Sequence, residues 1–390
     1  MDVRAIVIIG AHSDAVTENK SEQQLSNANY GLADVLGKPV AFRVIDRLKD
    51  YDVQNVTVVT DVPTHLWPVG TAVNGNWIST PSEQLWKSAE SVFSDFAQNG
   101  AESVIVVRLG TYAEIDYSDL LQAHINSDAP ITAALDDAGV PFGTYIASTS
   151  RRNHAAYMFR HAMQQFRTPC EPYLFSGYLN HLSSPNHLRQ LAIEGLMRRI
   201  QLVPEGEQMK PGVWVGRGAQ IHKRARVLSP AFIGAGSRVR AAAVITRCTA
   251  LEHNTVVDCG TVVENVTTLP YTYLGAGLDV THAVVGHSRL YNLKRGVEVE
   301  FADPRLIGEA SSRAPLRALG SLLSLASFFP AQLLRGLFAT SHRENPASLP
   351  QSIAVPATVL EAAPVQATAP AVDAGEFPSQ LAIARRYGNE

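Results

Sequence analysis

The chain has few cysteines and little net charge. Its 390 residues include three cysteines, Cys170, Cys248 and Cys259, and their spacings match no metal-binding pattern. They therefore favour thiols in a reducing compartment over a disulfide framework or a structural zinc site. The formal net charge of −3 gives no reason to expect general nucleic-acid binding.

Targeting segments and long apolar runs are also missing. Residues 1–4 lead directly into an apolar strand without the features of a signal peptide, so we expect a cytoplasmic protein. The uncharged stretch 318–334 has 17 residues and contains Pro330, which is short for a membrane span. Arginines flank it. Residues 314–340 therefore suggest either an amphipathic helix lying on an anionic membrane or a helix packed on protein.

A strict six-residue period runs from residue 213 to residue 263. Branched aliphatic residues occupy Val215, Ile221, Val227, Ile233, Val239, Ile245, Leu251, Val257 and Val263. A small or short residue stands two places before each of them. This period fits neither a helix nor an isolated strand. Because residues two apart on a strand share a face, both columns should point inward, which predicts a parallel β-helix with three strands per coil. The end coils of such a stack need caps.

The N-terminal half instead alternates buried strands with amphipathic helices. Strands are predicted at 4–9, 56–60, 104–107 and 131–135. Helices are predicted at 38–49, 82–96, 118–125 (with Ser118 as its cap) and 172–203. The alternation predicts a doubly wound α/β domain.

These patterns divide the chain into four parts. We expect an α/β domain over 1–205, a β-helix over 206–305, an amphipathic helical segment over 306–345 and a flexible tail over 346–390. The last part is rich in Ala, Pro, Val and Ser, a composition that cannot bury enough apolar surface to order itself.

This layout resembles that of sugar-1-phosphate nucleotidyltransferases, such as mannose-1-phosphate guanylyltransferases and glucose-1-phosphate nucleotidyltransferases. Leu36-Gly37-Lys38-Pro39 resembles the Gly-Lys-Pro segment of that family. Residues 115–121 resemble the stretch after its metal-binding Gly-Asp, and Ser176-Gly177-Tyr178 resembles its Gly-Ile-Tyr strand. The resemblance implies a left-handed β-helix, a homo-oligomer, and a role in nucleotide-sugar metabolism that feeds exopolysaccharide synthesis.

The sequence departs from the family at its charged positions. The first loop, Gly10-Ala11-His12-Ser13-Asp14, lacks the second glycine and the arginine that hold the nucleotide phosphates. Tyr30 replaces the lysine of the family, and neither Gly110-Thr111 nor residues 182–185 supply its metal-binding carboxylates. Because this chemistry depends on charge neutralisation by Mg²⁺ and cations, we expect weak, altered or lost nucleotidyl transfer. Mg²⁺ would be needed only for residual transfer, and a rearranged metal site that uses Asp116 or nearby acids stays open.

Five residues are candidates for binding a nucleotide or a sugar phosphate: Gly10, His12, Lys38, Arg108 and Asp116. Arg108 ends the third strand, where open α/β sheets bind ligands, and could meet a phosphate in place of a metal. The alternatives are a structural salt bridge for Arg108, a solvated lysine for Lys38 and a local helix cap for Asp116.

The β-helix offers two further functions. Hexapeptide acyltransferases use a histidine as general base, for which His222, His253, His282 and His287 are the candidates here. A regulatory or scaffold subunit that binds an active paralogue is the other alternative. His222, Arg240 and Asp258 should form one outward column, in which Arg240 bridges to Asp258. The first coils are crowded with basic residues: Arg217, Lys223, Arg224, Arg226, Arg238, Arg240 and Arg247. They could receive a phosphorylated ligand or an acidic partner, or form a solvated face.

Overall fold

The computed structural model describes residues 1–10, 25–27, 30–62, 76–149, 170–286 and 288–310. All of these described residues belong to one compact unit. His12, the membrane contact predicted for 314–340 and the predicted tail lie outside the described residues, as does nearly all of the predicted helical segment. No helix in the described part of the chain is long and apolar enough to cross a membrane.

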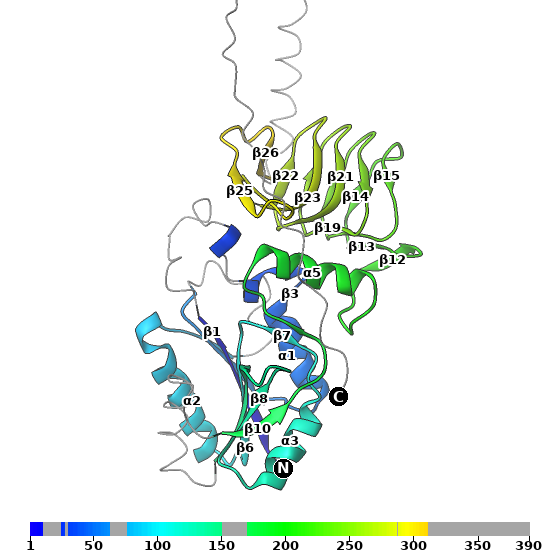
Figure 1. Ribbon diagram of the computed structural model, residues 1–390. Helices are drawn as coiled ribbons and strands as arrows, with labels where there is room; N and C mark the ends of the chain where they lie inside the picture. Colours follow the sequence, from blue (N-terminus) through cyan, green and yellow to red (C-terminus); the bar gives the residue numbers. More distant parts are fainter. Residues whose placement is uncertain (11–24, 28–29, 63–75, 150–169, 287, 311–390) are drawn as a thin grey trace, which may run out of the picture. The chain divides into compact units, whose positions relative to one another are not determined.

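A seven-stranded sheet organises the N-terminal half, in the order β10-β8-β9-β6-β1-β4-β5 (Figure 1). The strands are β1 (Val3–Ile9), β4 (Val56–Thr60), β5 (Asn76–Ser79), β6 (Ser103–Arg108), β8 (Ile131–Leu135), β9 (Pro141–Ser148) and β10 (Glu171–Leu174). Strand β9 runs antiparallel to β6 and β8, and the other pairs are parallel. The predicted α/β domain is therefore present with a mixed sheet.

Helices α1 (Val40–Asp50) and α3 (Tyr117–Ser127) cover one face of this sheet and α2 (Leu85–Gln98) covers the other (Figure 1). Helix α5 (Pro185–Leu196) lies next to the coils instead. Along β1, Val7 packs in the same apolar cluster as α1, whereas Ile6 and Ile8 pack in the cluster that contains α2. Both faces of β1 are thus buried, which is why its sequence is a continuous apolar run with no polar alternation.

The helix boundaries differ from the predicted ones for local reasons. Helix α1 begins at Val40, because Lys38–Pro39 form the short strand β3, paired with β2 (Asp34–Val35). The prediction that Ser118 caps the third helix is wrong, since the Asp116 side chain accepts hydrogen bonds from the N–H groups of Ser118 and Asp119.

The continuous helix predicted over 172–203 is also wrong. Glu171–Leu174 form strand β10 instead, and Leu179–Asn180 form β11, which pairs with β7 (Tyr112–Ala113). Only α5 is helical, and the Ser184 hydroxyl accepts from His187 N–H to cap it. Apolar residues at both strand and helix spacing occur in this stretch, so periodicity alone did not separate the two.

The second half consists of stacked coils of short parallel strands. Val213 lies opposite Ala231, and Ala231 lies opposite Thr249, so each coil spans eighteen residues. The first face holds β13 (Val213–Val215), β16 (Ala231–Ile233) and β19 (Thr249–Leu251). The second holds β14 (Gln220–Ile221), β17 (Arg238–Val239), β20 (Val256–Val257) and β22 (Thr272–Leu274). The third holds β15 (Arg226–Val227), β18 (Val244–Thr246) and β21 (Val262–Thr268).

The two columns predicted to point inward do so. From Ile233 to Val263 every aliphatic residue of the period is buried in one cluster. From Ala231 to Thr261 the small residues two places before them are buried as well, and their hydroxyl groups form hydrogen bonds inside the coils. The Ser237 hydroxyl donates to Glu252 O (2.9 Å) and accepts from Thr255 N–H (3.0 Å). The left-handed sense implied by the resemblance stays a prediction.

The two ends of the stack are closed differently. At the first coil, β12 (Glu207–Lys210) pairs antiparallel with β13 alone. At the last, β23 (Asp279–Gly286), β24 (Arg289–Asn292) and β25 (Val297–Glu300) form an antiparallel meander, and β26 (Ile307–Glu309) covers β22. The last coil is therefore capped, as the stacked architecture requires.

The sheet and the coils share one apolar cluster. Trp214, Phe232 and Ala250 of the coils belong to the same cluster as Leu36 and Leu188 of the N-terminal half. Gly37 lies against this contact, since a Cβ built on it would stand 2.9 Å from the Phe232 ring. The predicted boundary near residue 205 stays a prediction, because contacts continue across it.

Candidate functional site

The carboxyl ends of β1 and β6 lie side by side where the strand order changes direction. From β1 the sheet extends through β4 and β5 on one side and begins with β6 on the other. Val7 and Ile8 pair with Val107 and Arg108, so Gly10 and Arg108 reach the same edge. Open α/β sheets bind ligands in the crevice outside such a switch point. We therefore take this strand-end edge as the candidate site.

Arg108 is the cation of this edge. Its side chain is exposed, whereas the rest of β6 is buried. The guanidinium carbon lies 5.7 Å from the centre of the Trp86 ring on α2. An arginine over an aromatic face is held in place without losing its charge, so it can still attract an anion.

Gly143 lets β9 approach the end of β6 closely. Its φ is +96°, and a Cβ built on it would stand 2.9 Å from the Arg108 carbonyl oxygen. Any side chain at this position would be strained by the backbone and would press on the residue that carries the candidate charge.

We expect Gly143→Ala to destabilise the protein by about 2 kcal/mol, because backbone strain and contact with Arg108 add. Gly139→Ala is the matched control, since Gly139 also has a positive φ, +75°, but no atom within 4 Å of the added Cβ. Urea unfolding of the full chain measures both. Equal losses for the two variants would show that the contact with Arg108 costs nothing.

The acidic residues that follow β6 in the sequence, Glu114 and Asp116, accept hydrogen bonds from backbone N–H groups. One Asp116 oxygen accepts from Ser118 N–H (2.9 Å) and Asp119 N–H (3.1 Å) at the start of α3. Glu114 accepts from the Gln201 N–H (2.6 Å). Among the described residues, no group of three His, Cys, Asp or Glu could hold a metal ion. The rearranged metal site therefore stays a prediction.

Lys38 does not reach the strand-end edge in this structure. Its ammonium group contacts the Asp46 carboxylate and lies 3.8 Å from Glu205 Oε1. Leu36 and Gly37, just before it, have positive φ values of 53° and 89°. Their N–H groups donate to Glu252 Oε1 (2.7 Å) and Oε2 (2.8 Å). The Gly-Lys-Pro segment is therefore held by a carboxylate of the coils.

Glu252 belongs to a buried polar cluster that sequence reasoning missed. It is fully buried, and burial, with the nearby Asp34 charge, raises the pKa of its carboxyl well above the usual range. Asp34 is buried too and forms an ion pair with His253 Nδ1. Arg43 donates to Val35 O (2.6 Å) at the edge of this cluster. Glu252 could have been noticed because no Asp or Glu occurs from 208 to 251.

His253 is oriented by its neighbours in the fold. Burial acts to lower the pKa of its imidazole, but the hydrogen bond to Asp34 and the charges of Asp34 and Glu252 raise it overall. The ring also stands edge-on to Tyr271, with centroids 5.1 Å apart. A carboxylate on Nδ1 also orients the histidine bases of catalytic sites, so the general-base role of His253 stays a prediction.

The stability of this cluster should depend on pH. Both Glu252 and His253 have a pKa raised in the folded state, so the folded chain binds more protons than the unfolded chain. Their contribution is complete below the unfolded pKa values, about 4.3 and 6.5, and is lost as pH rises through the folded values. Unfolding free energy measured across this window should therefore fall towards alkaline pH. In the His253→Gln variant the free energy of unfolding should fall less steeply with pH, and in the His124→Gln variant it should fall at least as steeply as in the unaltered chain. The reverse pattern would contradict the assignment of this pH dependence to His253.

The other coil candidates lie in turns and on the surface. His222 is exposed, and its Nδ1 accepts from Arg224 N–H (3.1 Å). Arg240 Nη1 lies 3.4 Å from Asp258 Oδ1, as the predicted column requires. Strands β14 and β17 place His222 one coil before Arg240. The column is therefore present, and it has the features of a charge ladder.

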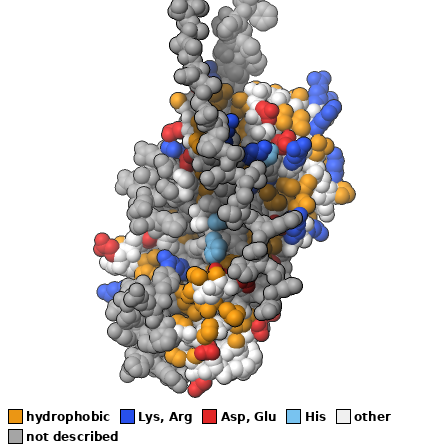
Figure 2. Space-filling model, in the orientation of Figure 1, with side chains coloured by type: hydrophobic (Ala, Val, Ile, Leu, Met, Phe, Trp, Pro, Cys, Tyr) orange, Lys and Arg blue, Asp and Glu red, His pale blue; other side chains and the backbone are white. Residues whose placement is uncertain are grey.

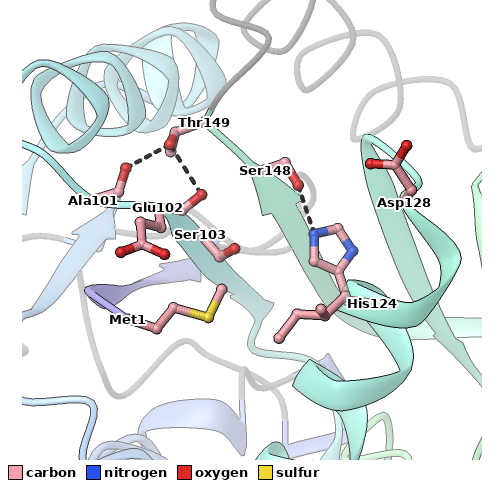
Figure 3. Close-up of a pocket in the computed structure, with 9 residues that line it drawn as sticks. Met1, Ala101, Glu102, Ser103, His124, Asp128, Ser148 and Thr149 are labelled. Atoms are coloured by element: carbon pink, nitrogen blue, oxygen red, sulfur yellow. Dashed lines mark hydrogen bonds between the residues drawn. The ribbon is translucent and has the colours of Figure 1, made fainter.

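A hollow of about 350 Å³ lies at the opposite, amino end of the parallel strands (Figure 3). His124 lines it and is buried, with Nδ1 2.7 Å from Thr132 Oγ1 and Nε2 2.9 Å from Ser148 Oγ. Burial lowers the pKa of this imidazole. Both ring nitrogens are satisfied by hydroxyls, and no lysine or arginine is found among the described residues that line the hollow.

The comparisons with known proteins identify no family for this chain. The sequence matches no protein-family model, and no curated protein matches it. Among solved structures, HddC from Yersinia pseudotuberculosis is similar over 48% of this chain and 97% of its own, with 15% identity and a TM-score of 0.35. The same protein complexed with GMP-PN covers the same shares at 16% identity and a TM-score of 0.35. Similarity this low identifies neither an activity nor a site.

Proposed function

We propose that this chain is a sugar-1-phosphate nucleotidyltransferase-like protein that binds a nucleotide sugar or a sugar phosphate. Its setting would be nucleotide-sugar metabolism that feeds exopolysaccharide synthesis. The observation that carries the proposal is the exposed Arg108 at the switch point, beside Gly10 at the end of β1. A nucleotide sugar or a sugar phosphate presents phosphate oxygens, and a planar guanidinium matches them in charge and geometry.

We further propose that nucleotidyl transfer is weak, altered or lost. Transfer at a pyrophosphate needs several cations close to the phosphates. Leu109-Gly110-Thr111 directly follow β6 and bring no carboxylate for a metal, and the Thr111 hydroxyl donates to Phe142 O (2.9 Å). Lys38 is paired with Asp46 and Glu205. Binding by one arginine requires none of these missing groups.

Two features of the coils belong to the same proposal. We infer that the stack is a left-handed β-helix of hexapeptide repeats and that the chain forms a homo-oligomer, as the resemblance implies. The acyltransferase stays an alternative, with His253, oriented by Asp34, as its candidate base. The scaffold alternative, in which the chain binds an active paralogue, gains support from the basic residues of the first coils that have no carboxylate partner in the described part of the chain.

Arg108→Met tests the proposed binding. The full chain is screened by thermal shift against nucleoside triphosphates, sugar 1-phosphates, nucleotide sugars and acetyl-CoA, with and without Mg²⁺. We expect a shift with a nucleotide sugar or sugar phosphate that does not need Mg²⁺. Arg108→Met should lower the affinity for that ligand about tenfold or more, since a charge-assisted hydrogen bond contributes about 1.5–3 kcal/mol.

Lys87→Ala is the matched control, because Lys87 is another exposed cation, on α2 beside Trp86. It should leave the affinity unchanged. A shift with acetyl-CoA alone would favour the acyltransferase. A strictly Mg²⁺-dependent shift with a triphosphate would contradict the loss of transfer chemistry.

A further inference from the structure

The first coil presents an exposed strand edge that is rich in positive charge and has no acidic residues. No Asp or Glu occurs from residue 208 to residue 251, a stretch with eight lysines and arginines, in a chain of net charge −3. In Figure 2 their side chains gather along the side of the coils that carries β14 and β15. The excess charge is therefore concentrated at one end of the stack.

Most of these cations have no acidic neighbour. Arg240 lies near Asp258 and Arg247 near Glu264. The other exposed cations of the first two coils, for which no carboxylate partner exists among the described residues, are Arg217, Lys223, Arg224, Arg226 and Arg238. Like charges this close repel, which costs stability unless an anionic partner is present.

The backbone at the same place is open for pairing. Strand β14 pairs only with β17 and β15 only with β18, whereas β13 is covered by β12. The N–H groups of Arg226 and Leu228 donate to the second coil, so that of Val227 between them faces away from the stack. Such an edge pairs readily with another strand.

The end of the apolar core is also only partly covered there. Ile221 and Val227 belong to the core columns but are only half-buried, whereas Val239 and Ile245, one coil further on, are buried. Leu228 beside them is 51% exposed. A strand laid along this edge would cover apolar side chains as well as pair backbone groups.

We propose that the free edge of β15, with Lys223, Arg224 and Arg226 beside it, binds an extended acidic segment of a partner protein. The partner would add a strand to the coil and place its acidic side chains against the unpaired cations. A second copy of this chain would bring the same basic edge, and so the same charge. The chain's own residues 311–390 carry six arginines and five acids, which gives no acidic complement.

A defined peptide tests the proposal with the full-length protein. The probe is a short fluorescent peptide of alternating glutamate and valine, and fluorescence anisotropy measures its binding at low and high salt. We expect binding that weakens as salt rises. The same peptide with N-methyl groups on alternate residues keeps its charge but cannot pair as a strand, so its binding should be lost.

Charge reversal locates the binding. The double variant Lys223→Glu, Arg226→Glu should bind the peptide at least about tenfold more weakly than the unaltered chain. Lys294→Glu with Arg295→Glu is the matched control, since both residues are exposed in the β24–β25 turn at the other end of the stack. It should bind like the unaltered chain.

Three results of the peptide experiments would overturn the proposal. They are no binding of the acidic peptide, equal binding of the N-methylated peptide, and equal weakening by both charge reversals. A dimer that forms through this edge and is broken by Lys223→Glu would show a second copy as the occupant, which also overturns it. None of these results depends on whether a sugar phosphate binds near Arg108.

Discussion

Replacing Glu252 with alanine should lower the free energy of unfolding by about 3 kcal/mol. The buried N–H groups of Leu36 and Gly37 would both lose their acceptor, and each unsatisfied group costs about 1–3 kcal/mol. The loss of Glu252 would also leave space between the coils and the Gly-Lys-Pro segment. Urea unfolding of the full chain measures the effect.

Glu264→Ala is the matched control in the next coil. Glu264 forms a partly exposed ion pair with Arg247, for which about 0–1 kcal/mol is expected. A loss for Glu252→Ala no larger than that for Glu264→Ala would contradict the role given to this carboxylate.

Replacing Arg189 with alanine should also cost about 3 kcal/mol. This α5 arginine is 3% exposed, and its guanidinium donates to Cys248 O (2.7 Å), Asn265 Oδ1 (2.7 Å) and Thr267 Oγ1 (3.0 Å) in the coils. Burial lowers the pKa of Arg189 to about 10, so it stays charged at neutral pH. Hydrogen bonds to a charged group contribute about 1.5–3 kcal/mol each, and part of that is offset by the cost of burying the charge.

Arg199→Ala provides the comparison, since Arg199 is exposed and has a 3.4 Å ion pair with Glu194 near the end of the same helix. It should change the free energy of unfolding by less than about 1 kcal/mol. Thermal and urea unfolding of both variants compare the two losses of stability. Similar stabilities would mean that Arg189 does not join α5 to the coils.

The coils were the most predictable part of the fold. Their period fixes which residues face inward, and the eighteen-residue register follows from it, as the pairing of Val213 with Ala231 shows. Strand β1 was equally clear, because burial on both faces leaves a continuous apolar run. These features depend on neighbours at a fixed spacing along the chain.

The mixed sheet and its edges were harder to predict. Strand β9 was not predicted, and its register with β8 is irregular. Two glycines with positive φ mark this region of the sequence: Gly139 precedes the strand and Gly143 lies within it. Residues 172–174, predicted to be helical, belong to strand β10. These elements are fixed by partners far away in sequence, which no local period reveals.

The candidate site was predicted only in part. Arg108 lies at the strand-end edge as expected, because its place follows from the strand before it. The pairings of Lys38 with Asp46 and of His253 with Asp34 could not be foreseen, since each depends on how distant segments pack. Glu252 and Arg189 were missed for the same reason: a buried charge becomes visible only with its partners.

Hydrogen exchange along the full chain would test the proposed binding site most directly. The protein is exchanged alone and with saturating nucleotide sugars and sugar 1-phosphates, and protection is read by mass spectrometry. We predict that at least one of these ligands slows exchange at the ends of β1 and β6, in peptides that contain Gly10 and residues 108–111. Exchange around the hollow, at 101–103 and 148–149, should not change. No protection at the strand ends, or protection confined to the hollow or the coils, would contradict the proposed function.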